Sequence, residues 1–313
     1  MKHKDLRTVE IWLRGGLGNQ LFQYAFARNL KERSDCELII RGDLLPKLDD
    51  VFNGHSRWAE QISTFRHAGR LLSKRHQPTS GTHLISKILT AQRIASDLAP
   101  STMARLGVIA GNRFLNWDVT SRRLEGHKRL SLNNYFHDMR PIKSIQNILR
   151  DEIRDVANPS KEMQSEVSHV KEKMGIHIRL GDHVQMKTNL IERYVDTLKS
   201  AMAQLEMSKL NPNFALFSDD VNLAMDILDK AGVSGDRVAP VRDQGLRPIE
   251  TLHLLSSCSG LVATPSTFAW WGAFLQDRRE YPIMFKSPWT NDPRDAPSDK
   301  IFLPEWKLLP RPY

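Results

Sequence analysis

The stretch VEIWLRGGLGNQLFQYAFARNLKERSDCELIIR, residues 9–41, decides the fold class. It begins with an apolar run, Val9 to Leu13, which is typical of a β-strand. After a glycine-rich turn, apolar residues recur with the period of an amphipathic helix from about Asn19 to Arg33, with one apolar stripe. A second strand is predicted from Cys36 to Arg41. Strand, glycine turn, helix and strand form a βαβ unit, which implies a parallel sheet.

The second half of the chain, after Asn158-Pro159, alternates more regularly between short apolar runs and helical periods. This alternation predicts a doubly wound α/β domain, in which ligands bind beyond the carboxyl ends of the strands. Strands are predicted at Gly175–Leu180, Phe214–Phe217, Arg237–Val241, Gly260–Ala263 and Tyr281–Phe285, and helices at about 191–207, 221–231, 249–257 and 265–276.

We therefore predict two α/β domains, 1–157 and 158–313, with a site between them. Within the first, residues from about 55 to 110 are predicted to form helices with a break at Gln77 to Gly81, and residues 111–157 show no clear pattern. The part from Arg57 to Arg105 contains eight Lys or Arg against two acidic residues. A solvated helix face explains such an excess most simply, and a surface that meets an anionic membrane or a lipid-linked acceptor is the alternative.

Composition narrows the class of protein. With 40% hydrophobic and 26% charged residues, a mean hydropathy of −0.43 and no long apolar run, the chain is expected to be globular. The first residues show no signal-peptide core, so we expect a cytoplasmic location. The net charge of +9 suits anionic partners, but no nucleic-acid-binding pattern accompanies it. Cys36 and Cys258 lie among apolar residues and are predicted to be buried free thiols.

The strand Gly175–Leu180 ends in a basic pair. Strand alternation sends Leu180 to one face with the apolar residues, and His177 and Arg179 to the other. Arginine suits a diphosphate because its planar fork donates hydrogen bonds in pairs and keeps its charge. A half-exposed strand with a solvated polar face is the alternative interpretation.

The strand Phe214–Phe217 is followed at once by Ser218, Asp219 and Asp220. Asp220 is predicted to cap the next helix. Asp219 is then free to point into the crevice, where a carboxylate can accept hydrogen bonds from N1–H and N2–H of guanine. This pairing is a hypothesis that would explain a preference for GDP.

The segment from Thr264 to Ala273, TPSTFAWWGA, is predicted to begin a helix with Thr264 as cap and Pro265 in the first helical position. Backbone N–H groups near Ser266 and Thr267 then lie unpaired at a positive helix end, which favours an anion such as phosphate. A capped core helix with packed tryptophans is the alternative.

The glycine turn of the first domain, Gly15 to Gln20, resembles a dinucleotide-binding loop, but Leu21 stands where the third glycine would be. No Gly-Lys-Ser/Thr follows either, which argues against phosphate-loop ATPases and NAD enzymes. The glycines are better explained by a close approach of backbone to a ligand, with Asn19 and Gln20 offering amides, or by a tight turn alone.

Four segments together resemble the bacterial α-1,2-fucosyltransferases of glycosyltransferase family eleven. They are the loop from Gly15 to Ala25, the strand end from His177 to Asp182, Phe217 to Asp220, and Ser266 to Ala273. The sequence departs from the family at Leu180, where a second arginine is usual, and at His183, where tyrosine is frequent. This departure bears on linkage more than on the nucleotide.

The resemblance implies a GT-B fold, with two Rossmann-like domains facing a cleft, and transfer of L-fucose from GDP-fucose with inversion and without a metal ion. It places Arg179 on the β-phosphate, and a noncatalytic role is expected for Trp306 in packing. It also places His177 and Asp219 near the guanosine, and Ser266, Thr267 and Phe268 near the diphosphate. We further predict that Gly16, Asn19, Gln20 and Ser218 contact the donor.

Catalysis requires stabilisation of the charge that grows on the β-phosphate, and Arg179 with the helix start at Ser266 could supply it without a cation. No persuasive Asp-x-Asp motif is present. Asp182 and His183 are candidates for the general base by location alone. The expected acceptor is a lipid-linked oligosaccharide for surface polysaccharide, and the resemblance implies a terminal galactose. Another linkage, another GDP-sugar or a noncatalytic binding protein are the alternatives.

Overall fold

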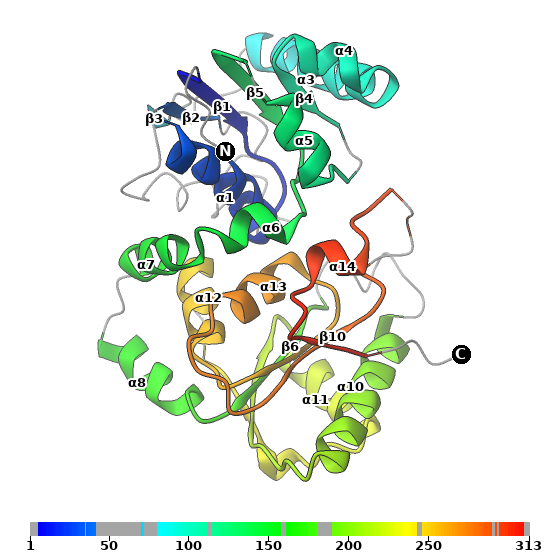
Figure 1. Cartoon of the computed structure of the whole chain (residues 1–313). Helices are drawn as coiled ribbons and strands as arrows, with labels where there is room; N and C mark the ends of the chain where they lie inside the picture. Colours follow the sequence, from blue (N-terminus) through cyan, green and yellow to red (C-terminus); the bar gives the residue numbers. More distant parts are fainter. Residues whose placement is uncertain are drawn as a thin grey trace. The chain divides into compact units, whose positions relative to one another are not determined.

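The computed structural model describes residues 6–34, 36–41, 70–71, 80–111, 114–124, 126–157, 161–180, 190–242, 246–289, 292 and 294–309. The chain divides into two units, each with its own parallel sheet (Figure 1). Unit 1 consists of Met1–Val156 and Asp292–Ile301, and unit 2 consists of Ala157–Asn291 and Phe302–Tyr313. Two Rossmann-like parallel sheets are the components of the predicted GT-B architecture, and the predicted α/β fold class is confirmed.

Unit 1 has a five-stranded sheet in the order β3-β2-β1-β5-β4. The predicted βαβ unit is confirmed, because β1 and β2 pair in parallel, with Val9 opposite Leu38, and α1 connects them. The strands are β1 Thr8–Trp12, β2 Glu37–Arg41, β3 Arg70–Leu71, β4 Val108–Ala110 and β5 Arg129–Asn133. The helices are α1 Leu17–Arg33, α3 Ser80–Leu98, α4 Pro100–Arg105, α5 Trp117–Arg123, α6 Met139–Lys143, α7 Gln146–Ala157 and α14 Ser298–Ile301.

Helix α1 is buried on more sides than one apolar stripe would require, and several of its buried polar side chains are hydrogen-bonded. Gln23 accepts a hydrogen bond from the Arg14 backbone N–H at 2.9 Å and donates one to the Arg14 carbonyl at 3.0 Å. Tyr24 and Arg28 both donate to Glu152 of α7, at 2.8 and 2.9 Å. Burial and the Glu152 carboxylate raise the pKa of Tyr24 above its usual value. The helix therefore lies inside unit 1 without leaving these groups unpaired.

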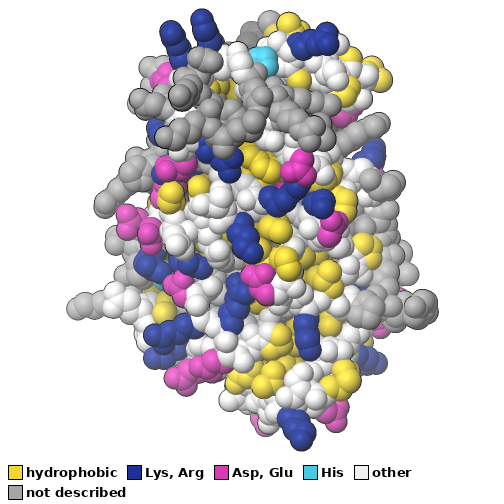
Figure 2. Space-filling view, viewed as in Figure 1, with side chains coloured by type: hydrophobic (Ala, Val, Ile, Leu, Met, Phe, Trp, Pro, Cys, Tyr) yellow, Lys and Arg dark blue, Asp and Glu magenta, His cyan; other side chains and the backbone are white. Residues whose placement is uncertain are grey.

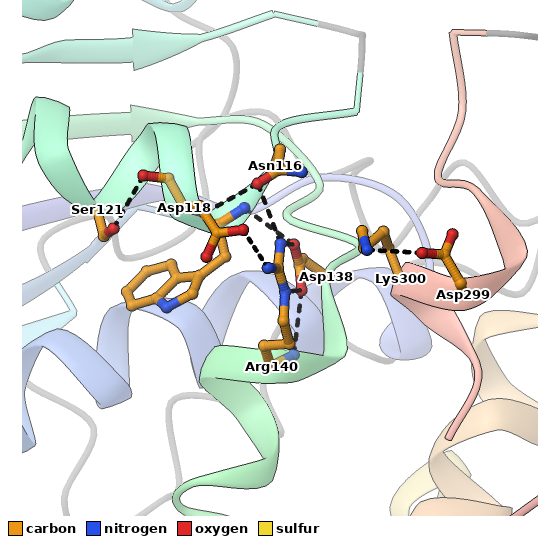
Figure 3. A network of polar contacts seen from close by, with 8 residues as sticks. Asn116, Asp118, Ser121, Asp138, Arg140, Asp299 and Lys300 are labelled. Atoms are coloured by element: carbon orange, nitrogen blue, oxygen red, sulfur yellow. Dashed lines mark hydrogen bonds and ion pairs between the residues drawn. The ribbon is translucent and has the colours of Figure 1, made fainter. Parts of the chain in front are cut away.

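A second polar network fixes the start of α6 (Figure 3). Asp138, which is 1% exposed, caps α6 through the Arg140 N–H and accepts a hydrogen bond from the Trp117 N–H at 2.9 Å. The Arg140 guanidinium binds both carboxylate oxygens of Asp138, at 2.9 and 2.6 Å, and reaches Asp118 of α5 at 2.5 Å. The bidentate contact and the bond to Asp118 join α5 to α6.

Two expectations for the first half of the chain need correction. The segment 55–110 is not helical throughout, because β3 and β4 lie within it. Residues 292–301, assigned above to the second domain, belong to unit 1. There the Phe114 N–H donates to the Arg294 carbonyl at 2.7 Å, and α14 contacts α6. Both differences depend on contacts between segments far apart in sequence, which local patterns do not encode.

Unit 2 has a six-stranded sheet in the order β8-β7-β6-β9-β10-β11, which is the Rossmann order 3-2-1-4-5-6. The predicted alternation of strands and helices is confirmed, and β11 adds an unpredicted last strand. The strands are β6 Met174–Ile178, β7 Phe214–Ser218, β8 Val238–Pro240, β9 Leu261–Ala263, β10 Ile283–Lys286 and β11 Lys307–Leu309. The helices are α8 Lys161–Val170, α10 Leu190–Met207, α11 Val221–Lys230, α12 Pro248–Ser256 and α13 Thr267–Phe274, with a short 3₁₀ turn at Gly235–Arg237.

Helices cover both faces of this sheet (Figure 1). On one face α10 and α11 enclose a core with the apolar side of β6. On the other, α12 and α13 pack so closely that a Cβ on Gly272 would lie 2.4 Å from Leu255. Trp270 and Trp271 are fully buried, and Trp306 stacks on Phe285, so the expected packing role of Trp306 is confirmed. Cys36 in unit 1 and Cys258 in unit 2 are buried free thiols, as predicted.

Candidate functional site

The described site residues that were predicted in the second half of the chain lie at the carboxyl edge of the unit 2 sheet. Strands β6 and β9 are neighbours at the point where the strand order reverses, and β7 lies on the other side of β6. In a doubly wound sheet the chain leaves the two central strands in opposite directions at this point, which opens a crevice for a ligand. His177, Ser218 and Ala263 are the residues at or next to these three strand ends.

The alternation predicted for β6 is confirmed. Ile176, Ile178 and Leu180 are each 1% exposed and belong to the core beneath α10 and α11. His177 lies on the opposite face, where its ring stacks on Phe268 with centroids 5.7 Å apart. Leu180, which replaces the arginine usual in the family, is therefore a packing residue.

His177 is a buried polar side chain with an unused hydrogen-bonding atom. It is 9% exposed, and within the described part of the chain its Nδ1 has no hydrogen-bond partner. Burial, together with the nearby positive charge of Arg179, lowers the pKa of His177 to about 4, against the opposing effect of Asp219. The ring is therefore neutral at pH 7, and its Nδ1 is available to a ligand that enters the edge.

Arg179 is held by a residue that the sequence analysis missed. The Tyr194 hydroxyl of α10 accepts a hydrogen bond from the Arg179 backbone N–H at 3.0 Å and donates one to its carbonyl at 2.8 Å. Tyr194 is 5% exposed, and burial raises its pKa. The sequence gives little indication of this role, because Tyr194 belongs to a predicted amphipathic helix and its position there predicts only a buried core residue.

The end of β7 contains Asp219 and the predicted cap Asp220. Asp220 caps α11 through the Leu223 N–H at 3.0 Å, as predicted. Asp219 is exposed but not free, because its Oδ1 accepts the Leu180 backbone N–H at 2.7 Å. Ser218 is engaged with Asp220, whose N–H it accepts at 3.1 Å. Asp219 thus ties the end of β7 to the end of β6, and a carboxylate keeps further acceptor positions after one such bond.

Helix α13 begins two residues later than predicted. Its N-cap is Ser266, whose Oγ accepts the Ala269 N–H at 3.4 Å, so Thr264 is not the cap and Pro265 is not in the helix. Thr264 instead shares a hydrogen bond with Tyr194. The cap uses the third N–H of the helix, and the N–H groups of Thr267 and Phe268 have no intrahelical partner. Such a helix start attracts an anion, and the ring of His177 stacks on Phe268 in its first turn.

The predicted residues of the glycine loop lie in unit 1, after β1. Gly15 has φ +74, a left-handed conformation that favours glycine, and the loop passes into α1 at Gly16. Asn19 Oδ1 lies 3.2 Å from His137 Nε2. Gln20 is fully buried and donates from Nε2 to the Gly15 carbonyl at 2.8 Å. A tight turn thus explains Gly15, and the amides of Asn19 and Gln20 lie beside it.

Some predictions fall outside the described residues, among them Asp182, His183 and, in the basic stretch, Arg57, Arg66, Lys74 and Arg75. Among the residues that are described, no group of three or more His, Cys, Asp or Glu side chains is placed to hold a metal ion. Nor does the described part contain a helix with the length and apolar character needed to cross a membrane.

Comparison with known proteins identifies the family. The family model described as glycosyl transferase family 11 matches residues 108–309, well over half of the chain. The chain belongs to glycosyl transferase family 11. The match includes the whole carboxyl edge of the unit 2 sheet, and the protein is therefore a family 11 glycosyltransferase.

Individual relatives of this family 11 protein are distant. An alpha-1,2-colitosyltransferase of Escherichia coli is 24% identical over 299 residues, covering 88% of this chain and 90% of that protein. The galactoside alpha-(1,2)-fucosyltransferase 1 of Mus musculus is 28% identical over 141 residues, which cover 44% of this chain and only 35% of the mouse enzyme. Among solved structures, the fucosyltransferase NodZ from Bradyrhizobium matches with a TM-score of 0.49 and 13% identity, covering 85% of this chain and 92% of that one.

Proposed function

We propose that the protein is an inverting transferase that moves L-fucose from GDP-fucose to a glycan hydroxyl, with α-1,2 linkage to a terminal galactose. The observation that carries the proposal is the carboxyl edge of the unit 2 sheet, where Arg179, the unpartnered Nδ1 of His177 and the start of α13 meet at the strand-order reversal. A cation, a neutral buried acceptor and free backbone N–H groups suit a nucleoside diphosphate.

In this proposal the guanine base and the two phosphates of GDP-fucose bind to different parts of the edge. Asp219 is exposed beyond its bond to Leu180, so its remaining lone pairs can accept N1–H and N2–H of guanine. His177 and Phe268 lie near the guanosine, and Ser218 lies next to Asp219. Arg179 and the N–H groups of Thr267 and Phe268, next to the Ser266 cap, bind the diphosphate.

Catalysis then follows from where charge develops. As the bond between the fucose anomeric carbon and the β-phosphate oxygen breaks, GDP leaves with the electron pair, and the acceptor oxygen forms the new bond from the opposite face. Donors that are already fixed stabilise this charge without reorganisation, and Tyr194 fixes the backbone of Arg179 on both sides. The acceptor's proton passes to a base, for which Asp182 is the first candidate and His183 the second. Gly16, Asn19 and Gln20 are proposed as further contacts to the donor.

No metal ion or other cofactor is needed in this scheme, because Arg179 and the helix start take the place of the cation. The similarity to the E. coli colitosyltransferase over 88% of the chain supports a second candidate, transfer of colitose or of another sugar from its GDP-sugar. Both candidates share the nucleotide site and differ in the sugar.

A transfer assay tests the proposal. The protein is incubated with GDP-fucose, GDP-mannose or UDP-galactose and a panel of β-galactosides, with EDTA in parallel samples, and the product linkage is determined by NMR. We expect the protein to release GDP and to form an α-1,2-fucosyl product, and we expect both to occur equally in the samples that contain EDTA. GDP release from another GDP-sugar alone would favour the second candidate. Binding without any release would indicate a noncatalytic protein, and loss of activity in EDTA with recovery on Mn²⁺ would contradict the metal-free scheme.

We also propose that the protein acts in the cytoplasm, on an acceptor that can be lipid-linked, and that helices α3 and α4 meet an anionic membrane. Ile94, Leu98 and Leu106 are 56%, 81% and 71% exposed there, next to Arg105, whereas apolar side chains of this size usually lie inside. Figure 2 shows hydrophobic side chains beside Lys or Arg side chains at the upper right, where α3 and α4 lie in Figure 1. Co-flotation with phosphatidylglycerol vesicles but not with phosphatidylcholine vesicles is expected, and equal flotation with both would contradict an electrostatic contact.

A further inference from the structure

The turn that follows β5 in unit 1 contains a strained residue. Phe136 has φ +54, a left-handed conformation that a bulky residue rarely adopts, and it is 1% exposed. The Asn134 side chain accepts the Phe136 N–H at 3.1 Å, and the Phe136 carbonyl accepts the Asp138 N–H at 2.8 Å. A residue in such a conformation persists only where its surroundings hold it there, and strain of this kind is frequent at functional sites.

Two sets of contacts hold this turn. The Phe136 ring stacks on Phe26 of α1, with centroids 4.0 Å apart and planes 15° from parallel. Asp138, the last residue of the turn, is 1% exposed, and the fork of Arg140 binds both of its carboxylate oxygens, at 2.9 and 2.6 Å. The same fork reaches Asp118 of α5 (Figure 3). Asp138 and Arg140 therefore fix the end of the strained turn to two helices of unit 1.

The turn brings His137 to the start of α1. The strand order of the unit 1 sheet reverses between β1 and β5, so the segments that follow these two strands are neighbours at one edge. The His137 ring stacks on Tyr135, with centroids 5.4 Å apart, and meets Phe22 of α1 edge-on at 4.9 Å. Its Nε2 lies 3.2 Å from Asn19 Oδ1. Because an amide oxygen only accepts, Nε2 carries the proton and donates to Asn19.

The hydrogen bond from His137 to Asn19 is made by an uncharged ring. Burial, together with the nearby charge of Arg14, lowers the pKa of His137 to about 3, so the ring is neutral at pH 7. A neutral ring with its proton on Nε2 is a state that depends on the position of the turn, because a ring displaced toward water would regain an ordinary pKa. The state of His137 therefore reports whether the turn is in place.

We infer that Asp138 and Arg140 are positioning residues for the transfer reaction, because they hold the strained turn from which His137 fixes the side chain of Asn19. The inference rests on the proposed function, in which Asn19 contacts GDP-fucose, and it deepens that function by naming what holds this contact in place. A displacement of about 1 Å at a contact with substrate is enough to slow a reaction strongly, even when its cause lies far from the reacting atoms.

The test uses the full chain and three variants. Arg140→Gln removes the fork and keeps the backbone N–H that Asp138 caps. Arg140→Lys keeps the charge beside the buried carboxylate and loses the paired donors, so it carries the test if Arg140→Gln does not fold. Arg294→Gln is the matched control, because Arg294 binds Asp292, also two positions earlier, through its N–H at 2.9 Å and its Nε at 2.9 and 3.0 Å, but lies outside the turn.

The first readout is the NMR signal of the His137 ring, assigned by comparison with His137→Gln, and it requires no substrate. In the wild type and in Arg294→Gln we expect a ring protonated on Nε2 that does not titrate between about pH 5 and 8. In Arg140→Gln we expect the ring to titrate nearer the ordinary pKa of about 6.5, because the turn is no longer held. Arg140→Lys should lie between these two results.

The second readout is steady-state transfer from GDP-fucose, with the melting temperature of each variant recorded alongside. Arg140→Gln should lower kcat/KM by about tenfold, and Arg140→Lys should recover part of this loss. Arg294→Gln should stay within about twofold of the wild type, because an exposed ion pair contributes little. A structural role alone would lower the melting temperature and leave both the His137 signal and kcat/KM unchanged.

The inference is overturned if folded Arg140→Gln keeps the wild-type signal of His137, or if its kcat/KM stays within about twofold of the wild type. Failure of the proposed function is seen separately, as absence of transfer from GDP-fucose by the wild-type protein. In that case a changed His137 signal in Arg140→Gln would still support the positioning of His137 by Arg140, and an unchanged signal would overturn it.

Discussion

The two sheets end in edges that carry different polar side chains. In unit 2 the edge holds Arg179 and the start of α13, whereas in unit 1 the corresponding edge holds the buried amides of Gln20 and Asn133. Both edges lie where the order of parallel strands reverses. The topology of the two edges is thus equivalent, and the residues that end each strand give each edge its own chemistry.

The largest expected effect separates the two edges by charge. Arg179→Ala should lower turnover by on the order of 10² to 10³, because a lost donor to a developing oxyanion costs about 2.7–4 kcal/mol. The loss should appear in kcat more than in GDP affinity, since the charge is greater in the transition state. Steady-state kinetics with GDP-fucose would measure both.

Two variants control this experiment. Arg179→Lys should recover part of the rate, because an ammonium keeps the charge and loses the paired donors. Arg278→Ala removes an exposed arginine that precedes β10, at the amino edge of the same sheet, and should leave turnover unchanged. A folded Arg179→Ala protein within about threefold of the wild-type rate would remove the proposed difference between the edges.

The two edges share one property, a histidine with a lowered pKa that is neutral at pH 7, and a change of pH tests it for His177. The pKa of His177 is about 4 in the folded protein and near 6.5 when unfolded, so the unfolded chain takes up the proton first as pH falls. The contribution of His177 to stability is therefore present above pH 6.5 and lost on acidification toward pH 4. Urea denaturation at pH 7 and pH 5 should show the wild type losing about 2 kcal/mol more than His177→Gln. Equal losses would mean that His177 is protonated or exposed in the folded state.

The smallest expected effect concerns Tyr194, which positions the backbone of Arg179. Tyr194→Phe removes both hydrogen bonds to the Arg179 backbone, and Tyr24→Phe in unit 1 removes one to Glu152. Each should lower the free energy of unfolding by about 1–2 kcal/mol. Chemical denaturation should show a similar loss in the free energy of unfolding for both variants. In steady-state kinetics only Tyr194→Phe should lower kcat, by severalfold. A similar loss of kcat in both variants would reduce the role of Tyr194 to general stability.

Much of unit 2 could be predicted because its signals are local. The alternation that buries Ile176, Ile178 and Leu180 also places His177 on the opposite face, and Asp220 caps the helix that its position predicts. Five short apolar runs were enough to indicate the doubly wound sheet, because fully covered strands are apolar on both faces.

The missed features depend on contacts that one segment cannot reveal. The sequence predicts Thr264 as the cap of α13. In the structure Thr264 shares a hydrogen bond with Tyr194, and Ser266 caps the helix instead. Asp219 reads as free, but it accepts the Leu180 N–H of a neighbouring strand. Asn133 lies in a stretch without a clear pattern, and its unpartnered amide has no counterpart in the sequence.

The central claim is that the edge of unit 2 binds GDP, and thermal unfolding with nucleotides tests it most directly. At a concentration of about one hundred times Kd, GDP should stabilise the folded protein by roughly 2.7 kcal/mol, seen as a higher melting temperature. UDP at the same concentration should give no comparable shift, because Asp219 pairs with groups that uracil lacks. Equal shifts with both nucleotides would contradict guanine recognition, and no shift with either would contradict the nucleotide site itself.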